Sequence, residues 1–139
     1  MTRVDFYVLA DRRPLARERI VCRLAEKAYG QQQRLYVHAQ AAAQVEALDG
    51  LLWTFRQQSF IPHGRLSSGD SEPVLLGHDG EPPHDYALLI NLAPEVPLFF
   101  SRFERVIEVI DGTPERRAQG RERFRFYKDR GYSLQTHKL

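Results

Sequence analysis

Two consecutive strand–helix units open the chain, and this alternation restricts the available folds more than any other feature of the sequence. Residues 4–9 form a short β-branched and aromatic run, and after Pro14 apolar residues recur at helical spacing up to Gly30. Residues 34–39 again favour a strand, and a second apolar helical stripe then ends near Trp53. Successive strand–helix units predict a parallel sheet with right-handed crossovers.

The middle of the chain is less regular, and two further strands follow it. Residues 64–85 are rich in glycine and proline and predict an irregular loop or hairpin, in which only residues 73–77 favour an extended piece. Residues 86–92 form an almost continuous apolar run, as expected for a central strand buried on both faces. A short helix is predicted over residues 96–103 and another strand over residues 105–110.

The last predicted element is a basic C-terminal helix over residues 113–131. Thr113 can cap this helix, and Pro114 then occupies the first helical position, where proline is favoured. Residues 1–139 therefore predict one three-layer α/β domain with a mostly parallel, twisted sheet. A hydrophobic content of 42% in 139 residues suffices for a core without a disulfide or a metal.

Several classes of function find no support in the sequence. Neither G-x-G-x-x-G nor G-x-x-x-x-G-K-[ST] occurs, so we expect no dinucleotide-binding glycine loop and no cofactor. The five histidines show no metal-ligand spacing, so we expect no metal site. The lone Cys22 cannot form a disulfide within the chain, which fits a reducing, cytoplasmic setting. The apolar runs are too short to predict a signal peptide or a membrane span.

One segment concentrates the positive charge of the chain. Residues 115–130 hold seven Arg or Lys and three acidic residues, a net charge of +4, whereas the remaining residues come to −2. Phe124, Phe126 and Tyr127 lie among these charges. A cationic surface with aromatic rings suits a partner that is acidic and carries apolar or π surface. Nucleic acid and an acidic protein tail both fit that description.

Helical spacing places three cations and a ring on one narrow face of this segment, with a fourth cation at its margin. The face holds Arg117, Arg121, Phe124 and Lys128, and the cation at its margin is Arg125. A solvated basic face would show the same spacing. Gly120, on the flank, costs about 1 kcal/mol relative to alanine in a helix interior, which indicates close approach by a partner or by the adjacent strand.

A second candidate surface is the aromatic segment between Trp53 and His63. Trp53, Phe55, Phe60 and Ile61 crowd a stretch that Pro62 and Gly64 keep from being a long helix. These rings can be ordinary core residues, or they can form a protein-binding patch of exposed aromatics beside proline. The sequence leaves both alternatives open.

Catalytic chemistry has only weak candidates. His84 lies beside Asp85 and could form an acid/base pair, but a solvated turn is favoured for a Gly- and Pro-rich loop. A small α/β enzyme that uses His63, His84 or Asp85 stays an alternative hypothesis. No G-x-S-x-G nucleophile motif accompanies the serines of the same loop.

Four segments, read in order, resemble the chi subunit of bacterial DNA polymerase III over nearly the whole chain. They are the opening VDFYVL, the run from Trp53 to His63, the strand ALLINL, and the terminal RERFRFYKDRGYSL. The resemblance implies a non-catalytic accessory protein with a Rossmann-like fold that pairs with the psi subunit of the clamp loader. It also implies binding to the acidic C-terminal tail of single-stranded DNA-binding protein, so that DNA is reached mainly through that intermediary.

The resemblance also assigns residues to the two expected surfaces. The implied tail-binding residues are Ile110, Arg117, Arg121, Phe124 and Arg125. The implied psi-binding residues, on a surface also implicated in contact with a helicase-like repair protein, are Trp53, Phe60 and Pro62. Better-known relatives carry Lys and Tyr where this chain has Arg117, Arg125 and Phe124, so charge is kept and a phenolic hydroxyl is lost. The alternative function is direct binding of single-stranded nucleic acid.

Overall fold

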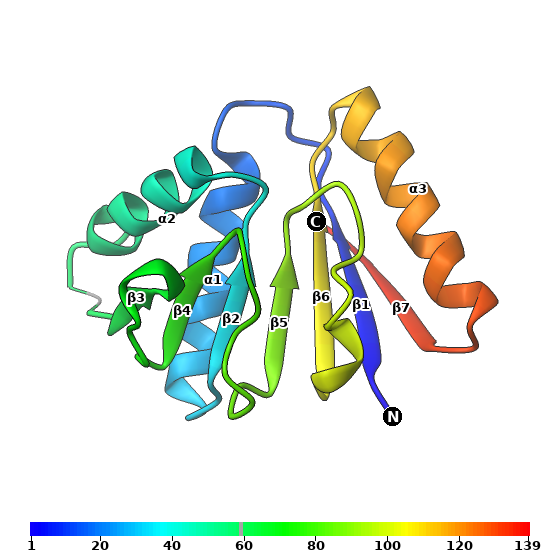
Figure 1. Ribbon diagram of the computed structural model, residues 1–139. Coiled ribbons are helices and arrows are strands. Elements are labelled where there is room, and N and C mark those ends of the chain that lie inside the picture. Colours follow the sequence, from blue (N-terminus) through cyan, green and yellow to red (C-terminus); the bar gives the residue numbers. More distant parts are fainter. Residues whose placement is uncertain (59) are drawn as a thin grey trace.

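Seven parallel strands form one sheet in the computed structural model, which describes residues 1–58 and 60–139 (Figure 1). Ser59, within the aromatic segment, lies outside the described residues. The sheet order is β3-β4-β2-β5-β6-β1-β7, and each pair of neighbouring strands is parallel. The strands are β1 (Arg3–Val8), β2 (Leu35–His38), β3 (His63–Arg65), β4 (Val74–Gly77), β5 (Leu88–Asn91), β6 (Arg105–Ile110) and β7 (Ser133–Lys138).

Helices cover both faces of the sheet, as expected for a three-layer, Rossmann-like α/β domain. The helices are α1 (Ala16–Gly30), α2 (Ala42–Thr54) and α3 (Pro114–Asp129), together with short 3-10 turns at Leu66–Ser68 and Phe100–Arg102. α1 and α2 pack on one face, and α3 packs on the other over β6, β1 and β7 (Figure 1). The loops after β4 and β5 cover the rest of the second face.

The two cores differ in composition because alternate residues of each strand point to opposite faces. The first core is aliphatic and joins Val21 and Ala25 of α1 to residues such as Val37 and Ile90. The second core is aromatic and includes Phe6, Tyr36, Phe100, Phe103 and Tyr127. All four residues of β5 are buried, and β5 is the middle strand, as its apolar run predicts.

Three predictions about the elements need correction. Residues 96–103 do not form a helix, because Pro97 starts a single turn in which the Phe100 N–H bonds to the Pro97 carbonyl three residues back. Residues 64–85 contain the predicted extended piece as β4, and they also hold part of β3 and the Leu66–Ser68 turn, which the sequence does not predict. The basic helix is not the last element, because β7 follows α3 and pairs with β1.

The start of α3 is where the sequence predicts it, with Thr113 at the N-cap and Pro114 in the first turn. The Thr113 side chain does not cap the helix, however. Its hydroxyl donates to Asp111 Oδ1 at 2.8 Å, and the Thr113 backbone N–H reaches the same oxygen at 3.1 Å. Asp111 therefore fixes the turn that leads from β6 into α3.

Candidate functional site

α3 is held against β6 by a buried polar network. The Arg123 Nε donates to Glu108 Oε1 at 2.8 Å, and the Tyr127 hydroxyl donates to Glu108 Oε2 at 2.8 Å. Asn91 of β5 donates to the same Oε2 at 3.0 Å. Burial raises the pKa of Glu108, and the Arg123 charge and the two neutral donors act against that rise. The network fixes which face of α3 lies on the sheet and which face is presented outward.

A cavity of about 450 Å³ lies between the outward part of α3 and strands β1, β6 and β7. Apolar side chains from three elements make part of its wall, and Phe6 and Phe124 contact each other edge to face with ring centroids 5.2 Å apart. The lining residues are Phe6, Val8, Ile110, Arg117, Gly120, Arg121, Phe124, Thr136 and Lys138. The cavity thus combines an apolar, aromatic wall with three cations.

The three cations of this cavity have no acidic partner. Across residues 1–58 and 60–139, no carboxylate oxygen lies within 4.0 Å of the charged nitrogens of Arg117, Arg121 or Lys138. Arg117 makes only a long bond of 3.5 Å to the Leu9 carbonyl. Other arginines of α3 are paired: Arg116 with Asp111, Arg123 with Glu108, and Arg125 with Glu122. Arg117, Arg121 and Lys138 are therefore free to meet an anion at the cavity, although Lys128 and Arg130 of α3 likewise have no acidic partner among the described residues.

Gly120 explains how α3 comes so close to the sheet. A Cβ atom at this position would overlap the Ile110 Cδ1 atom and lie 3.2 Å from its Cγ1. The adjacent strand β6 therefore makes the close approach that a glycine in a helix interior predicts. Gly120 and Ile110 also line the cavity, so the close contact between α3 and β6 lies at its wall.

The structure brings together four of the five predicted tail-binding residues. Ile110, Arg117, Arg121 and Phe124 line the one cavity. Arg125, at the margin of the same helical face, does not line it, and its Nη1 pairs with Glu122 Oε1 at 2.9 Å. Lys128, predicted on the same face, is also not part of the lining.

The sequence does not predict four of the nine residues that line the cavity. Phe6 and Val8 come from β1, and their spacing of two residues places both on the face that α3 covers. Thr136 and Lys138 come from β7, which the sequence does not predict as a strand. An i, i+2 pattern in the first strand is the one signal that points to part of this wall.

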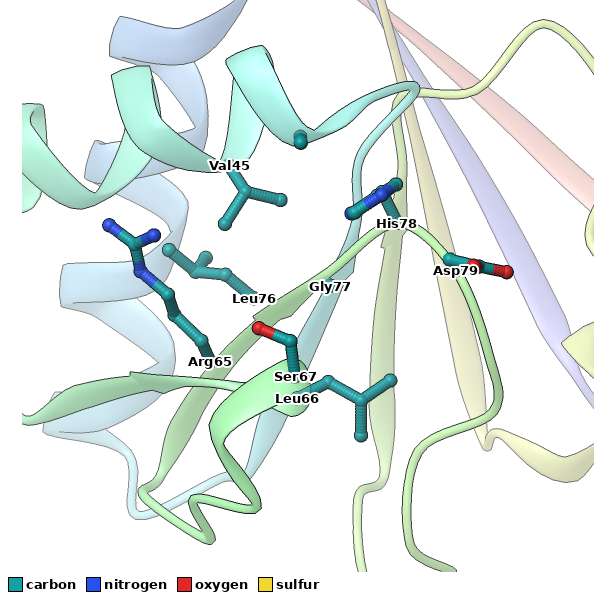
Figure 2. Close-up of a pocket in the computed structure, with 9 residues that line it drawn as sticks. Val45, Arg65, Leu66, Ser67, Leu76, Gly77, His78 and Asp79 are labelled. Atoms are coloured by element: carbon teal, nitrogen blue, oxygen red, sulfur yellow. The ribbon is translucent and has the colours of Figure 1, made fainter.

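A second cavity, of about 190 Å³, lies between the start of α2, the Leu66–Ser68 turn and the end of β4 (Figure 2). Its cation is Arg65, whose side chain extends toward α2 in Figure 2. Arg65 is paired with Glu46, and its Nη2 lies 3.1 Å from Asp49 Oδ2. Since the charge of Arg65 is already neutralised, this cavity offers less to an anionic ligand than the one beside α3.

The aromatic segment divides into a buried part and an exposed part. Ile61 is buried and Phe55 is partly buried, so the core interpretation holds for them. Trp53 and Phe60 are 56% and 65% exposed, and their ring centroids are 5.7 Å apart. Pro62 is half-buried next to them. We call Trp53, Phe60 and Pro62 together the aromatic patch.

The residues considered for acid/base chemistry have separate surroundings. His84 is exposed, and Asp85 pairs with Arg34 at 3.2 Å. The side chain of His63 is buried, with Asp49 and Trp53 as neighbours. Cys22 lies on the buried side of α1, as its position in the helix predicts, and burial raises the pKa of its thiol to about 12.

In the parts that the structure describes, no cluster of three or more His, Cys, Asp or Glu side chains could hold a metal ion. Among the same residues, no helix has the length and apolar character that crossing a bilayer requires.

Comparison with known proteins gives consistent matches along the chain. The family described as DNA polymerase III chi subunit, HolC, matches residues 1–135. The chain is 48% identical to DNA polymerase III subunit chi of Pseudomonas aeruginosa, covering 100% of this chain and 98% of that protein. It is 28% identical to the subunit chi of Haemophilus influenzae, over 95% of this chain and 94% of that one.

A solved structure shares the fold at low sequence identity. The crystal structure of T4 UvsW superimposes on 99% of this chain with a TM-score of 0.66 and 9% identity. The chain spans 42% of that protein's length. At this identity the likeness concerns the arrangement of strands and helices alone.

Proposed function

The chain belongs to the DNA polymerase III chi subunit family and is therefore a replication accessory subunit, and we propose that it binds two protein partners at opposite ends of its sheet. The first partner is the acidic C-terminal tail of single-stranded DNA-binding protein, received in the cavity between α3 and β7. The second is the psi subunit of the clamp loader, received at the aromatic patch beside α2 and β3. The proposed role is binding without catalysis.

The observation that carries the first assignment is the set of unpaired cations around an apolar wall. A terminal aromatic ring fits between Phe6, Ile110 and Phe124, where it would be removed from water. Carboxylates of the same tail would meet Arg117, Arg121 and Lys138, which have no acidic partner of their own. Arginine suits this task because its planar fork can bind one carboxylate through two hydrogen bonds.

The expected affinity is modest and depends on salt. Exposed ion pairs contribute about 0–1 kcal/mol each and are screened by added salt. Binding of several tails of one multi-tailed partner would raise the overall affinity by avidity. A surface of this kind favours reversible attachment to a coated template over permanent assembly.

The second assignment is supported by exposure of large rings. Trp53 and Phe60 stand next to each other with more than half of each side chain in contact with solvent. Exposed aromatic pairs of this kind are typical anchors of protein interfaces. The patch lies beside β3, whereas the cavity lies beside β7, and these are the two edge strands of the sheet. Both partners could therefore be bound at the same time.

Fluorescence anisotropy with a labelled acidic peptide that ends in phenylalanine tests the first assignment. Arg121→Ala is expected to weaken binding about fivefold, the equivalent of about 1 kcal/mol. Arg125→Ala is the matched control, because Arg125 lies on the same helix but outside the cavity and is paired with Glu122. Equal affinities for the wild type and Arg121→Ala would remove this residue from the site.

Direct binding of nucleic acid is distinguished in the same assay. Labelled single-stranded DNA is titrated with the chain alone and then with the chain plus the tailed binding protein. We expect association only when the tailed protein is present, since the three unpaired cations at the cavity stand around an apolar wall that suits a tail ending in a ring. Association with the chain alone, weakened by Arg121→Ala, would favour the nucleic-acid alternative.

A further inference from the structure

The solvent-facing side of α1 carries a row of three cations. Arg19, Arg23 and Lys27 follow one another at intervals of four residues, and all three are exposed. Because a helix rises about 1.5 Å per residue, successive members of the row stand about 6 Å apart along the helix axis. Buried residues of α1, such as Val21 and Ala25, lie on the opposite side of the helix. We call Arg19, Arg23 and Lys27 the α1 stripe.

The two acidic side chains of α1 are engaged with other partners. Glu18 Oε2 accepts a hydrogen bond from Gln44 Nε2 of α2 at 2.9 Å, and Glu26 Oε2 lies 3.2 Å from Arg56 Nε. In the part of the chain that the structure describes, no carboxylate oxygen comes within 4.0 Å of a charged nitrogen of the α1 stripe. The three charges are therefore free to meet an anion.

The spacing of the α1 stripe is unfavourable in a chain without a partner. Like charges four residues apart on a helix repel each other, and the stripe holds two such pairs, Arg19 with Arg23 and Arg23 with Lys27. Arg19 also lies in the first turn of α1, where the helix dipole disfavours a cation. An anionic partner laid along α1 would relieve both effects.

A fourth cation extends the row beyond the end of α1. Lys27 and Arg3 line one hollow of about 460 Å³. Arg3 is exposed and has no acidic partner among the residues described. The other charged side chains of the lining are Glu104 and Arg105, and Arg105 is paired with Asp5. None of the described residues that line this hollow is aromatic, in contrast to the cavity beside α3.

We propose that the α1 stripe contacts the phosphates of single-stranded DNA once the tail-binding cavity has tethered the chain to the coated template. A regular row of cations without an aromatic wall suits a polymer that carries a charge on every unit, whereas the α3 cavity suits a ligand that ends in a ring. The planar fork of arginine also matches the geometry of a phosphate. The tethering rests on the proposed function, but the contact between stripe and phosphates does not.

Salt determines when this contact matters. Three phosphate contacts on a single strand predict that log K falls with the logarithm of the salt concentration at a slope of about −2. Between about 150 mM and about 20 mM salt, the contact should therefore strengthen about 70-fold. At about 150 mM salt three exposed contacts do not hold the free chain on DNA. A tether raises the effective concentration of the stripe at the strand to the millimolar range, where the contact adds to the affinity.

Two variants with the same change in charge separate the α1 stripe from the rest of the surface. The stripe variant carries Arg19→Gln, Arg23→Gln and Lys27→Gln. The matched control, at the C-terminal end of α3 and outside the cavity, carries Arg125→Gln, Lys128→Gln and Arg130→Gln. Circular dichroism and urea denaturation check that both are folded. The stripe variant should be at least as stable as the wild type, because its like-charge pairs are gone.

Titration of labelled oligothymidylate with the free chain at about 20 mM salt tests the contact without any partner. The stripe variant should bind at least about tenfold more weakly than the wild type, and its salt slope should be smaller by about 2. The control variant should keep most of the wild-type affinity. Equal affinity and slope in the wild type and the stripe variant would overturn the proposal, and so would an equal loss in the control.

A parallel titration distinguishes nucleic acid from an acidic protein as the partner of the stripe. Labelled polyglutamate is compared with oligothymidylate of the same total charge at the same salt concentration. We expect the oligothymidylate to bind more tightly, with the stripe variant reducing that difference. Tighter binding of the polyglutamate would assign the stripe to an acidic protein and overturn the proposal.

The tethered contact is tested at about 150 mM salt. Each variant is titrated against the acidic, Phe-terminated peptide and against single-stranded DNA coated with the tailed binding protein. We expect the stripe variant to bind the peptide as the wild type does and to bind the coated DNA about fivefold more weakly. If the peptide binds none of the proteins, the proposed function fails while the titration at low salt stands. If the stripe variant binds coated DNA as tightly as the wild type, the tethered contact is refuted.

Discussion

Replacing Arg123 by methionine removes one half of the buried ion pair that fixes α3 on β6. The Arg123 Nε lies 2.8 Å from Glu108 Oε1, and both residues are buried. Methionine fills similar space but leaves the Glu108 charge without its counter-ion. Breaking a buried pair in this way costs about 3–5 kcal/mol, because an uncompensated charge stays inside the protein. The free energy of unfolding of a small domain is about 5–15 kcal/mol, so this substitution would remove a large part of it.

The cost of Arg123→Met should depend on pH in a defined direction. Burial already raises the pKa of Glu108, and Arg123 opposes that rise, so the variant should raise it further. A carboxyl whose pKa is higher in the folded state binds its proton more tightly there than in the unfolded chain. Its stabilising effect is therefore present at low pH and is lost as the pH rises from about 4.3 through the folded-state pKa. The variant should lose less stability at pH 5 than at pH 7.

Urea denaturation at the two pH values measures these quantities. Glu108→Gln in the Arg123→Met background should recover most of the loss at pH 7, because glutamine is neutral and can still accept from Tyr127 or Asn91. A loss below about 1 kcal/mol at pH 7, or the same loss at pH 5 and pH 7, would contradict the role assigned to this network.

Three other predictions concern the cavity and the thiol. Gly120→Ala should cost at least about 0.5 kcal/mol less in free energy of unfolding when Ile110→Val is also present, because valine lacks the methyl that the new Cβ would overlap. Additive effects of the two substitutions in urea denaturation would contradict this contact. Lys138→Ala should weaken an acidic, Phe-terminated peptide by up to about fivefold at low salt and less at high salt, while Arg125→Ala should leave the affinity unchanged in the same titration. Cys22, whose pKa is raised to about 12, should stay unmodified by a thiol reagent at pH 8 until urea unfolds the chain, and rapid modification of the folded chain would show that the thiol is accessible.

The sequence predicts those helices and strands whose buried residues form a recognisable apolar pattern. β5 reads as a continuous apolar run because both of its faces are covered, and α1 reads as an apolar stripe because one face is. β7 escapes prediction for the opposite reason. It is an edge strand with most of its residues in contact with solvent, so its sequence SLQTHK has little apolar alternation. Its place in the sheet comes from pairing with β1, at the far end of the sequence.

The sequence predicts the part of the candidate site that α3 supplies. Arg117, Arg121 and Phe124 share a helical face, and the structure places all three in one cavity. The rest of the wall depends on the neighbour order β6-β1-β7, which no local pattern contains. The sequence also holds a signal for the pairing of Arg125, because Glu122 lies three residues before it and the two form an i, i+3 ion pair.

A structure of the chain bound to an acidic peptide that ends in phenylalanine would test the central claim most directly. We expect the terminal ring to lie between Phe124 and Ile110, with the peptide carboxylates on Arg121 and Lys138. A peptide bound at the aromatic patch, or along α3 away from the cavity, would contradict the proposed site.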